Sequence, residues 1–431
     1  MLTVLKSSWA LLLGMFLLMF GNGLQGSLIG IRGDLEGFDP GVLSYVVSAY
    51  FLGFIAGSWA APALLRKVGH VRVFAAMASL ISAAFVIYPA LPDLIVWGLM
   101  RCLVGFCFAC VYVVVESWLN DAANNKNRGK ALSLYMIVQM LGLITAQGAL
   151  NLGDVGGYGL FILISVLVSI SFTPVLLNAT RMPVFETADA MSLKRLFDIS
   201  PLGVVGMVMV NLVYSVMFGM AAVYGTQRGL SIAEISILIA VFFAGGMLFQ
   251  YPVGWASDRM DRRLLIIALS FIAASACIAA ILAAGNPWII ISMAGVIGAT
   301  VNPLYALVIA HTNDYLEPQE MAAASSGLLF FGGFGAIFGP IFAGNMMQLF
   351  GPPAFFGTLF LFMITLGIYG LYRSRVRPSV PVEDTTSYPA YTAYAGAVAV
   401  EIAQEYAIDQ MDSETSEPSG DEKHTDPVPN A

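Results

Sequence analysis

The chain has 431 residues, of which 58% are hydrophobic and only 11% are charged. About a quarter of the residues in a soluble protein are charged, so this composition indicates a protein of the lipid bilayer. The formal net charge of −7 lies mainly near the C-terminus and therefore describes a tail, not a binding surface. The apolar runs do not alternate with polar residues as the strands of a membrane β-barrel do, which excludes that class.

Successive apolar runs have about the twenty residues that a helix needs to cross a bilayer core about 30 Å thick. The predicted spans are 9–30, 42–65, 71–91, 94–119, 131–152, 157–177, 201–224, 233–256, 263–284, 287–311, 322–348 and 353–373. This pattern predicts an all-α membrane protein with twelve transmembrane helices. Its predicted parts are an N-terminal six-helix bundle (1–177), a cytoplasmic linker (178–200), a C-terminal six-helix bundle (201–373) and a disordered cytoplasmic tail (374–431).

Lysine and arginine gather in every second loop, and short loops rich in these residues stay in the cytoplasm. With the N-terminus inside, the outer loops hold only Arg32 and Arg228. The inner loops hold Arg66, Lys67, Arg72, Lys126, Arg128, Lys130, Arg181, Lys194, Arg195, Arg259, Arg262 and Arg263. The asymmetry predicts that both termini are cytoplasmic and that the number of spans is even.

Residues of the kinds that carry catalysis or bind metals are few and scattered. Cys107 and Cys110 form a C-x-x-C by spacing, but without a second pair this indicates small residues packed in a helix. The chain has no G-x-x-x-x-G-K-[ST] for nucleotide phosphates, and its histidines are His70, His311 and His424. We therefore expect no catalytic residues, no metal, no cofactor, no enzymatic activity and no nucleic-acid partner.

The two halves of the chain contain a repeat. A shift of 192 residues places GFDPGVLSYVVSAYFLGFIAGSWAAPALLRKVGHVRV, from Gly37, over GLSIAEISILIAVFFAGGMLFQYPVGWASDRMDRRLL, from Gly229, without a gap. The basic cluster at Arg66, Lys67 and Arg72 then falls over the charged stretch 258–263. Duplicated halves are typical of transporter folds, so the repeat predicts two pseudo-symmetric bundles.

The charged stretch resembles a loop signature of the major facilitator superfamily, G-x-x-x-D-R-x-G-R-R. Its matching residues are Gly254, Asp258, Arg259, Arg262 and Arg263, and Asp261 stands where the second glycine is usual. In the N-terminal half Lys67, Gly69 and His70 fit the signature, whereas Pro62 and Arg66 depart from it.

The fourth span carries a second motif of the same superfamily, R-x-x-x-G-x-x-x-A, at Arg101, Gly105 and Ala109. GAIFGPIFAG in the eleventh span is similar to a glycine and proline pattern that many members carry in the fifth. The stretch 113–136, VVVESWLNDAANNKNRGKALSLYM, resembles most the bacterial branch of the superfamily typified by YcaD.

The resemblance implies that the charges of the signature loops form a cytoplasmic latch between the two bundles. The expected latch residues are Gly254, Asp258, Arg259, Arg262, Arg263, Arg66, Lys67, Gly69 and Glu116. A few surface contacts of about 0.3 to 1 kcal/mol each bias two conformations without freezing one. The alternative is that these charges only set topology. For Glu116 we expect an ion pair with Arg66, Lys67 or Arg128, with a proton-carrying role as the alternative.

Polar side chains at membrane depth are the candidates for substrate contact, because an unpaired amide in hydrocarbon costs several kcal/mol. The candidates are Asn22, Gln25, Arg101, Gln139, Gln147, Asn211, Tyr214, Asn302 and Tyr305. Arg101 either points into a central cavity and attracts a polar group or fixes its helix through carbonyl groups. For each uncharged candidate, bonding between helices is as probable as contact with a substrate.

The resemblance implies a secondary-active or facilitative transporter that moves a small organic solute across the bacterial inner membrane by alternating access. We expect its partners to be that solute and the lipid bilayer, and we expect a monomer. The alternatives are an exporter of drugs or toxic metabolites and a membrane receptor on the same fold whose tail gives the output. The first and seventh spans hold no Asp, Glu or His, so coupling to protons is left open.

Overall fold

The computed structural model describes residues 2–122, 128–178, 191–283, 285–378, 380–381, 385 and 388. The side chains of 2–8, 120–122, 128–130, 178 and 318 are not described. All regular secondary structure in the described residues is helical. Twelve spans in this part of the chain are long and apolar enough to cross a membrane, which confirms the predicted spans. The elements are α1 (Leu2–Leu35), α2 (Pro40–Val68), α3 (His70–Ala90), α4 (Leu94–Ala122), α5 (Arg128–Ala149), η1 (Leu150–Leu152), α6 (Gly159–Ser171), α7 (Thr173–Asn178), α8 (Leu193–Ile199), α9 (Pro201–Gln227), α10 (Ile232–Ser257), α11 (Arg262–Leu282), α12 (Pro287–Asn313), α13 (Pro318–Phe350) and α14 (Ala354–Val376).

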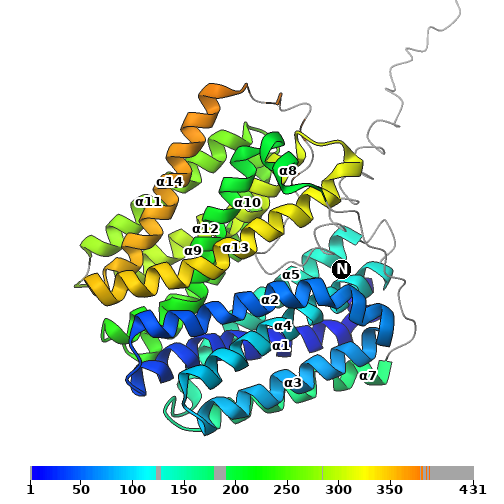
Figure 1. Cartoon of the computed structure of the whole chain (residues 1–431), viewed down its shortest axis with the longest axis vertical. Coiled ribbons are helices and arrows are strands. Elements are labelled where there is room, and N and C mark those ends of the chain that lie inside the picture. Colours follow the sequence, from blue (N-terminus) through cyan, green and yellow to red (C-terminus); the bar gives the residue numbers. More distant parts are fainter. Residues whose placement is uncertain are drawn as a thin grey trace, which may run out of the picture.

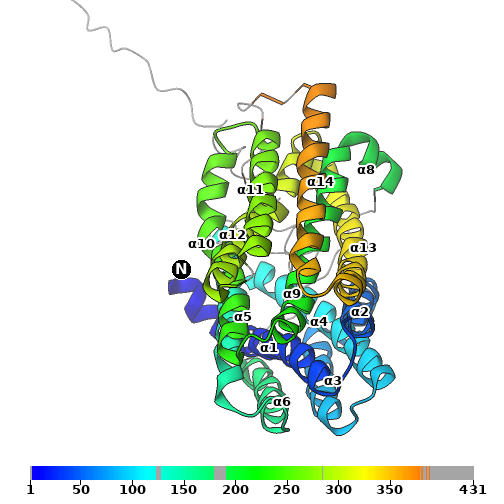
Figure 2. The same ribbon diagram turned by 90° about the vertical axis from the view of Figure 1, so that its left-hand side faces the viewer.

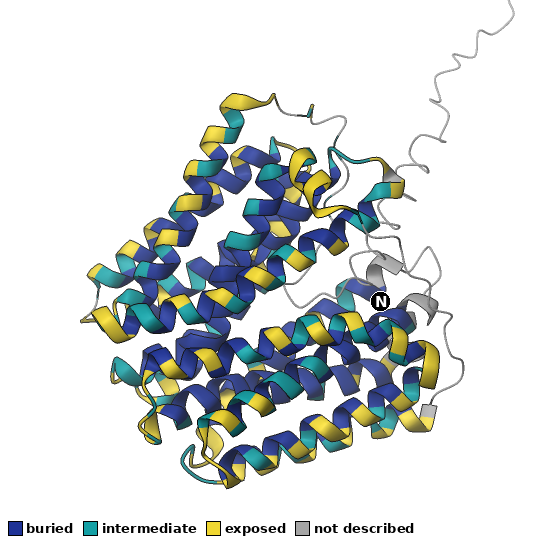
Figure 3. Ribbon diagram, viewed as in Figure 1, coloured by how far each residue is buried: buried dark blue, intermediate teal, exposed yellow. Residues whose placement is uncertain are grey.

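The helices form two bundles, α1–α7 and α9–α14 (Figures 1 and 2). Between the bundles α1 packs on α9, α2 on α13 and α5 on α10. α9, α10 and α13 are the counterparts of α1, α2 and α5, so a pseudo-two-fold axis exchanges the contact of α2 with α13 and the contact of α10 with α5. Buried residues lie on the helix faces that turn toward other helices, and exposed residues lie on the outer faces (Figure 3). The outer faces carry large apolar side chains such as Ile95 and Leu99, which suit contact with lipid.

The internal repeat predicted from the sequence recurs in the bounds of the helices. α10 begins at Ile232, 192 residues after α2 begins at Pro40, and α11 begins at Arg262, 192 residues after α3 begins at His70. The turns before α2 and α10 also correspond, because Gly37 has φ +78° and Gly229 has φ +73°. Both glycines occupy the left-handed region that a side chain disfavours, so the same residue type serves the same turn twice.

Glycines let α2 cross α4, and α10 cross α12, with their backbones in contact. A Cβ built on Gly105 of α4 would lie 1.9 Å from the carbonyl oxygen of Tyr50 in α2. In the second half a Cβ built on Gly298 of α12 would lie 1.9 Å from the carbonyl oxygen of Phe242 in α10. Small residues at such crossings are how helices associate in lipid, where no hydrophobic effect drives them together.

The bundles meet closely at one end, which we call the far end; it contains the turns before α2 and α10. A Cβ on Gly219 of α9 would lie 2.1 Å from Cγ1 of Val47, and Asn151 donates a hydrogen bond to Ser236 Oγ at 3.1 Å. The opposite end, which we call the linker end, contains α8 and the turns before α3 and α11. The ribbons of α2 and α13 diverge toward it (Figure 1).

Three details differ from the prediction. The sixth span is divided at Phe172 into α6 and α7, because Pro174 lacks the amide donor that a continuous helix needs. α14 continues to Val376, past the predicted start of the tail at 374. Tyr388, within the predicted disordered tail, is packed against the C-terminal bundle. Most of the remaining tail and the segment 179–190 of the linker lie outside the described residues, and the predicted domain boundaries stay predictions.

We predict that Gly105→Ala destabilises the protein, whereas Gly98→Ala on the same helix does not. A methyl group at residue 105 would collide with the backbone of α2, and overpacking of this kind costs about 1–3 kcal/mol. Gly98 has no neighbouring atom within 4 Å of the position where its Cβ would lie. The melting temperatures of the two variants in the same detergent test this, and equal values would contradict a tight crossing.

Candidate functional site

A cavity of about 490 Å³ lies between the two bundles toward the linker end. α5 contributes Met136, Ile137 and Met140 to its wall, and α10 contributes Met247, Gln250, Tyr251 and Trp255. The remaining lining residues are Ser133, Gly246, Gly254, Asp258, Arg259, Asn302 and Tyr388. Pockets that hold small organic ligands usually have 300–1,000 Å³ and a mostly apolar wall with few polar groups, and this cavity has both properties.

Asn302 is the sequence-predicted substrate candidate that lines this cavity. Its side chain is 3% exposed, and its Nδ2 donates to the carbonyl oxygen of Gly298, one turn earlier on α12, at 3.0 Å. Its Oδ1 is buried and accepts no hydrogen bond from the described residues. Because an unsatisfied buried acceptor costs about 1–3 kcal/mol, this oxygen is suited to a donor group of a ligand.

Tyr388 covers part of the cavity at the linker end. Its hydroxyl accepts a hydrogen bond from Gln250 Nε2 at 3.0 Å and donates to the carbonyl oxygen of Pro303 at 3.3 Å, and its backbone N–H donates to Asp258 Oδ1 at 2.8 Å. Burial raises the pKa of the Tyr388 hydroxyl, and the Asp258 carboxylate acts in the same direction, so the hydroxyl stays protonated and remains a donor.

Gly254, the first residue of the signature, makes this docking possible. A Cβ at residue 254 would lie 2.6 Å from Cδ1 of the Tyr388 ring. The ring therefore needs a glycine beneath it. Gly254 and Asp258 together form a binding surface for Tyr388, which lies 130 positions after Asp258 in the sequence.

Arg101 lies inside the N-terminal bundle and is fully buried. Its Nη1 donates to Gln25 Oε1 on α1 at 2.9 Å, and its guanidinium carbon lies 5.5 Å from the centroid of the Tyr50 ring on α2. Arg101 does not line the cavity described above. The observed contacts connect α1, α2 and α4, and a direct contact of Arg101 or Gln25 with a substrate stays a prediction.

Other predicted candidates bond mainly within their bundle. Gln147 accepts a hydrogen bond from Ser27 Oγ at 2.7 Å, which connects α5 with α1. Asn211 donates to the carbonyl oxygen of Met207 on its own helix at 2.9 Å. Asn22 donates to the Tyr50 hydroxyl at 3.4 Å.

Three further candidates are buried near the interface of the bundles. Tyr214 on α9 packs its ring against Phe242 of α10, with centroids 5.9 Å apart. Tyr305 lies one turn after Asn302 on α12, and its hydroxyl has no hydrogen-bond partner in the described part of the chain. Gln139 on α5 is fully buried. Substrate contact for these residues stays a prediction.

Glu116 is fully buried in α4, and the Tyr135 hydroxyl of α5 donates to its Oε1 at 3.2 Å. The expected ion pair with Arg66 or Lys67 is not formed within the described residues, because both basic side chains are exposed at the end of α2. The side chain of Arg128, the third predicted partner, lies outside the described residues. Gly69, two residues after Lys67, has φ +83°, which explains why this signature position is a glycine.

The charges of the second signature form contacts inside the C-terminal bundle. Arg262 is 2% exposed; its Nη1 lies 2.5 Å from Asp314 Oδ1, and its Nη2 lies 3.7 Å from Asp258 Oδ1. It thereby connects the ends of α10, α11 and α12. Arg259 stacks on Trp255, with its guanidinium carbon 4.5 Å from the ring centroid. A latch between the bundles stays a prediction.

Asp261 replaces the usual glycine of the signature and begins a helix instead. Its Oδ1 accepts the backbone N–H of Arg263 at 2.9 Å, which satisfies a free donor at the start of α11. Its Oδ2 lies 3.0 Å from Nη2 of Arg263. The departure from the signature therefore has a structural reason, N-capping.

Two other residues of the site, Gln250 and Tyr388, have only weak signals in the sequence. Gln250 is a polar residue in an apolar span, but nothing in the sequence pairs it with Tyr388, 138 positions away. Tyr388 stands in a stretch whose composition predicts disorder, so no pattern marks it as a docking residue. Among the described residues no group of three or more His, Cys, Asp or Glu side chains could hold a metal ion.

Comparison with known proteins agrees with this architecture. The family model of the Major Facilitator Superfamily matches residues 11–231 and 202–397. Proteins named "Uncharacterized MFS-type transporter YcaD" from Salmonella heidelberg (strain SL476) and Salmonella agona (strain SL483) are each 26% identical to this chain over 356 residues. Each alignment covers 81% of this chain and 91% of the relative.

Two solved structures are similar in fold. A mutant of the nucleoside transporter NupG has a TM-score of 0.74 at 14% identity, and the match covers 85% of this chain and 99% of that one. A bacterial homologue of the human lysosomal transporter Spinster, inward-facing and unoccupied, has a TM-score of 0.65 at 17% identity and covers 94% of this chain and 98% of its own. With the family model matched over both halves, the chain belongs to the major facilitator superfamily.

Proposed function

We propose that this protein carries a small amphipathic organic solute across the inner membrane by alternating access between its two bundles. The observation that carries the proposal is the cavity of about 490 Å³ between bundles that meet closely at the far end. A solute in this cavity contacts both bundles, so its binding energy differs between two arrangements of the bundles. Such a difference is what shifts a conformational equilibrium.

The wall of the cavity supports the choice of solute class. Thioether and aromatic side chains, among them Met140, Met247 and Trp255, offer polarisable apolar contact. Asn302 and Gln250 supply a few amide groups for orientation. A ligand with a flat or branched apolar body and one or two hydrogen-bonding groups fits this combination better than a sugar or an inorganic ion, which needs many polar partners.

The linker end is the cytoplasmic end in this proposal, because it carries the excess of lysine and arginine that keeps loops in the cytoplasm. The arrangement of the bundles then corresponds to an inward-facing carrier whose cavity is partly covered by Tyr388. We propose that Tyr388 is a removable cover, since it is held by three hydrogen bonds and no covalent or ionic link.

We predict that ligand binding depends on Asn302 and not on Asn211. In a thermal-shift screen of the purified protein with amphipathic metabolites, nucleosides and cationic dyes, a ligand that binds the folded state raises the melting temperature. Asn302→Leu should weaken the response to that ligand about three- to tenfold, the equivalent of one hydrogen bond. Asn211→Leu is the matched control, because Asn211 also bonds to its own helix but does not line the cavity. Equal losses in both variants would contradict a role for Asn302 in the site.

We predict that the cavity is reached from the cytoplasmic side. In a variant without native cysteines, Met140→Cys should react with a membrane-impermeant maleimide in inside-out vesicles, as should Lys67→Cys at the linker end. Pro92→Cys, in the exposed loop before α4, should react in right-side-out vesicles. If Met140→Cys reacts from the same side as Pro92→Cys, the proposed inward-facing state is wrong. If Lys67→Cys reacts only in right-side-out vesicles and Pro92→Cys only in inside-out vesicles, the proposed topology is inverted.

We predict that Tyr388→Ala speeds the labelling of Met140→Cys from the linker end. The loss of the side-chain hydrogen bonds and of ring packing should raise the open fraction about tenfold. Tyr388→Phe keeps the ring and removes the hydroxyl, so it should give an intermediate rate. An unchanged rate in Tyr388→Ala would show that the cover does not limit access.

A receptor on the same fold is the second class of function, and the same variants separate it from a carrier. Removal of residues 383–431, which include Tyr388, should leave a carrier able to transport its solute and abolish the output of a receptor. Flux is measured with the ligand that the thermal-shift screen identifies, in vesicles loaded on one side.

A further inference from the structure

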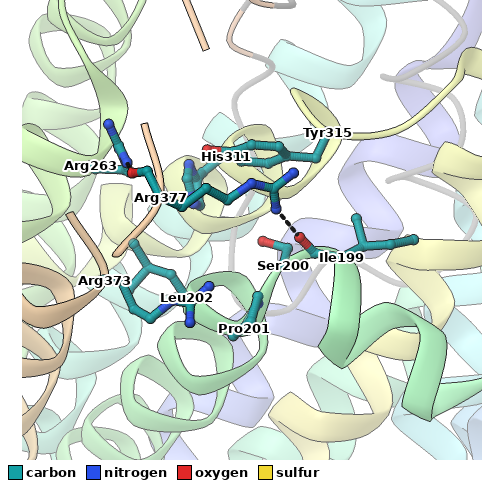
Figure 4. A pocket seen from close by; sticks show the side chains of 9 residues that line it. All are labelled: Ile199, Ser200, Pro201, Leu202, Arg263, His311, Tyr315, Arg373 and Arg377. Carbon is teal, nitrogen blue, oxygen red and sulfur yellow. Dashed lines mark hydrogen bonds between the residues drawn. The ribbon is translucent and has the colours of Figure 1, made fainter. Parts of the chain in front are cut away.

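A second pocket lies at the linker end of the C-terminal bundle, apart from the cavity between the bundles. It is lined by Ile199, Ser200, Pro201, Leu202, Arg263, His311, Tyr315, Arg373 and Arg377. These residues lie at the end of α8, at the starts of α9 and α11, and at or just after the ends of α12 and α14 (Figure 4). None of them lines the cavity proposed for the solute.

The pocket has an excess of positive charge. Arg263 forms an ion pair with Asp261, with Nη2 3.0 Å from Oδ2. Arg373 and Arg377 form no ion pair with the described residues, and the Arg377 guanidinium donates to the carbonyl oxygen of Ile199 at 2.7 Å and stacks on the Tyr315 ring at 4.1 Å. The nearby acid Asp314 is paired with Arg262. Among the described residues, Arg373 and Arg377 therefore have no carboxylate that compensates their charge.

His311 provides an independent indication of a ligand. Its side chain is 5% exposed and lines the pocket, and its ring forms no hydrogen bond with the described residues. The ring nitrogens are not among the fully buried polar atoms without a partner, so they remain accessible and a ligand in the pocket can hydrogen-bond to the ring. The Tyr315 ring packs edge-on against it, with centroids 5.3 Å apart, and thus holds its orientation.

The shape and the dipoles of the pocket also suit an anion. Ser200 begins α9, a helix of 27 residues, so the positive end of the helix dipole lies at the pocket. The enclosed part has about 20 Å³, which is room for a single oxygen atom of the size of a water oxygen. A larger anion would place one oxygen inside and its remaining atoms on the open side, beside the two arginines.

We propose that this pocket binds the phosphate group of an anionic phospholipid. The position favours a tethered phosphate, because the pocket lies at the ends of membrane-spanning helices and α14 exposes Leu371, Tyr372 and Val376 on its outer face. Acyl chains can cover these side chains while the headgroup contacts Arg373 and Arg377. The ligand then joins α9, α11, α12 and α14 at the linker end.

The test is a thermal-shift titration of the delipidated full-length protein with phosphatidylglycerol. Phosphatidylcholine and inorganic phosphate serve as the other ligands. Arg373→Ala is the principal variant, since its side chain forms no hydrogen bond or ion pair with described residues and its loss should leave the melting temperature of the lipid-free protein unchanged. Arg375→Ala is the matched control, because Arg375 is exposed two positions away and does not line the pocket.

We expect phosphatidylglycerol to stabilise the wild type and Arg373→Ala to need about tenfold more lipid or higher, as for a lost charge-assisted hydrogen bond. Arg375→Ala should raise the lipid concentration at the midpoint of the titration by about fivefold at most, which is what a diffuse surface charge contributes. His311→Phe keeps the packing on Tyr315 and removes the ring nitrogens, so it should also weaken the response.

Equal effects of Arg373→Ala and Arg375→Ala would overturn the proposal, as would equal stabilisation by phosphatidylglycerol and phosphatidylcholine. An equal response to inorganic phosphate would support the anion site and overturn the phospholipid as its source. Arg373→Lys, which restores the charge, should recover most of the response. If Arg373→Lys recovers none of the response to phosphatidylglycerol while Arg375→Ala behaves as the wild type, the phosphate is held by the geometry of the arginine side chain and not by its charge alone.

Discussion

The close crossing of α2 with α4, and of α10 with α12, is the constraint on which the rest of the structure depends. In a bilayer, helices gain nothing from withdrawing apolar side chains from water, so close backbone contact through glycine must supply the attraction. Gly105 and Gly298 bring two helices of each bundle into contact. Each bundle is thereby held together, and α1, α2 and α5 with their counterparts form a second interface between the bundles.

That second interface closes at the far end and leaves the cavity toward the linker end. Contacts such as Val47 with Gly219 are small and apolar, and no ion pair between the bundles is formed at this end among the described residues. An interface of this kind can separate without the breaking of ion pairs. The charged residues of the second signature are instead used inside one bundle, where Arg262 connects three helix ends. They hold the ends of α10, α11 and α12 together within the C-terminal bundle.

The sequence predicted the fold in detail because the fold depends on patterns that are local or repeated. Apolar length identifies each span, and the shift of 192 residues identifies the pseudo-symmetry down to the starts of α10 and α11. The site was predicted less well, because partners between helices have no local signal. Arg101 and Gln25 are 76 positions apart, so no local pattern predicts the hydrogen bond between them. The docking of Tyr388 and the convergence of Arg373 and Arg377 with His311 depend on the ends of several helices meeting, which composition does not encode.

The central claim is that the two bundles rock about their contact, and the two ends of α2 and α13 report it directly. Spin labels at Lys67→Cys and Gln319→Cys measure the linker end, and labels at Tyr45→Cys and Leu349→Cys measure the far end; all four side chains are exposed. Distance distributions in lipid nanodiscs should contain two components at both ends. A ligand that stabilises the protein should shift their populations in opposite directions. A single distribution that no ligand changes, or a shift in the same direction at both ends, would contradict alternating access.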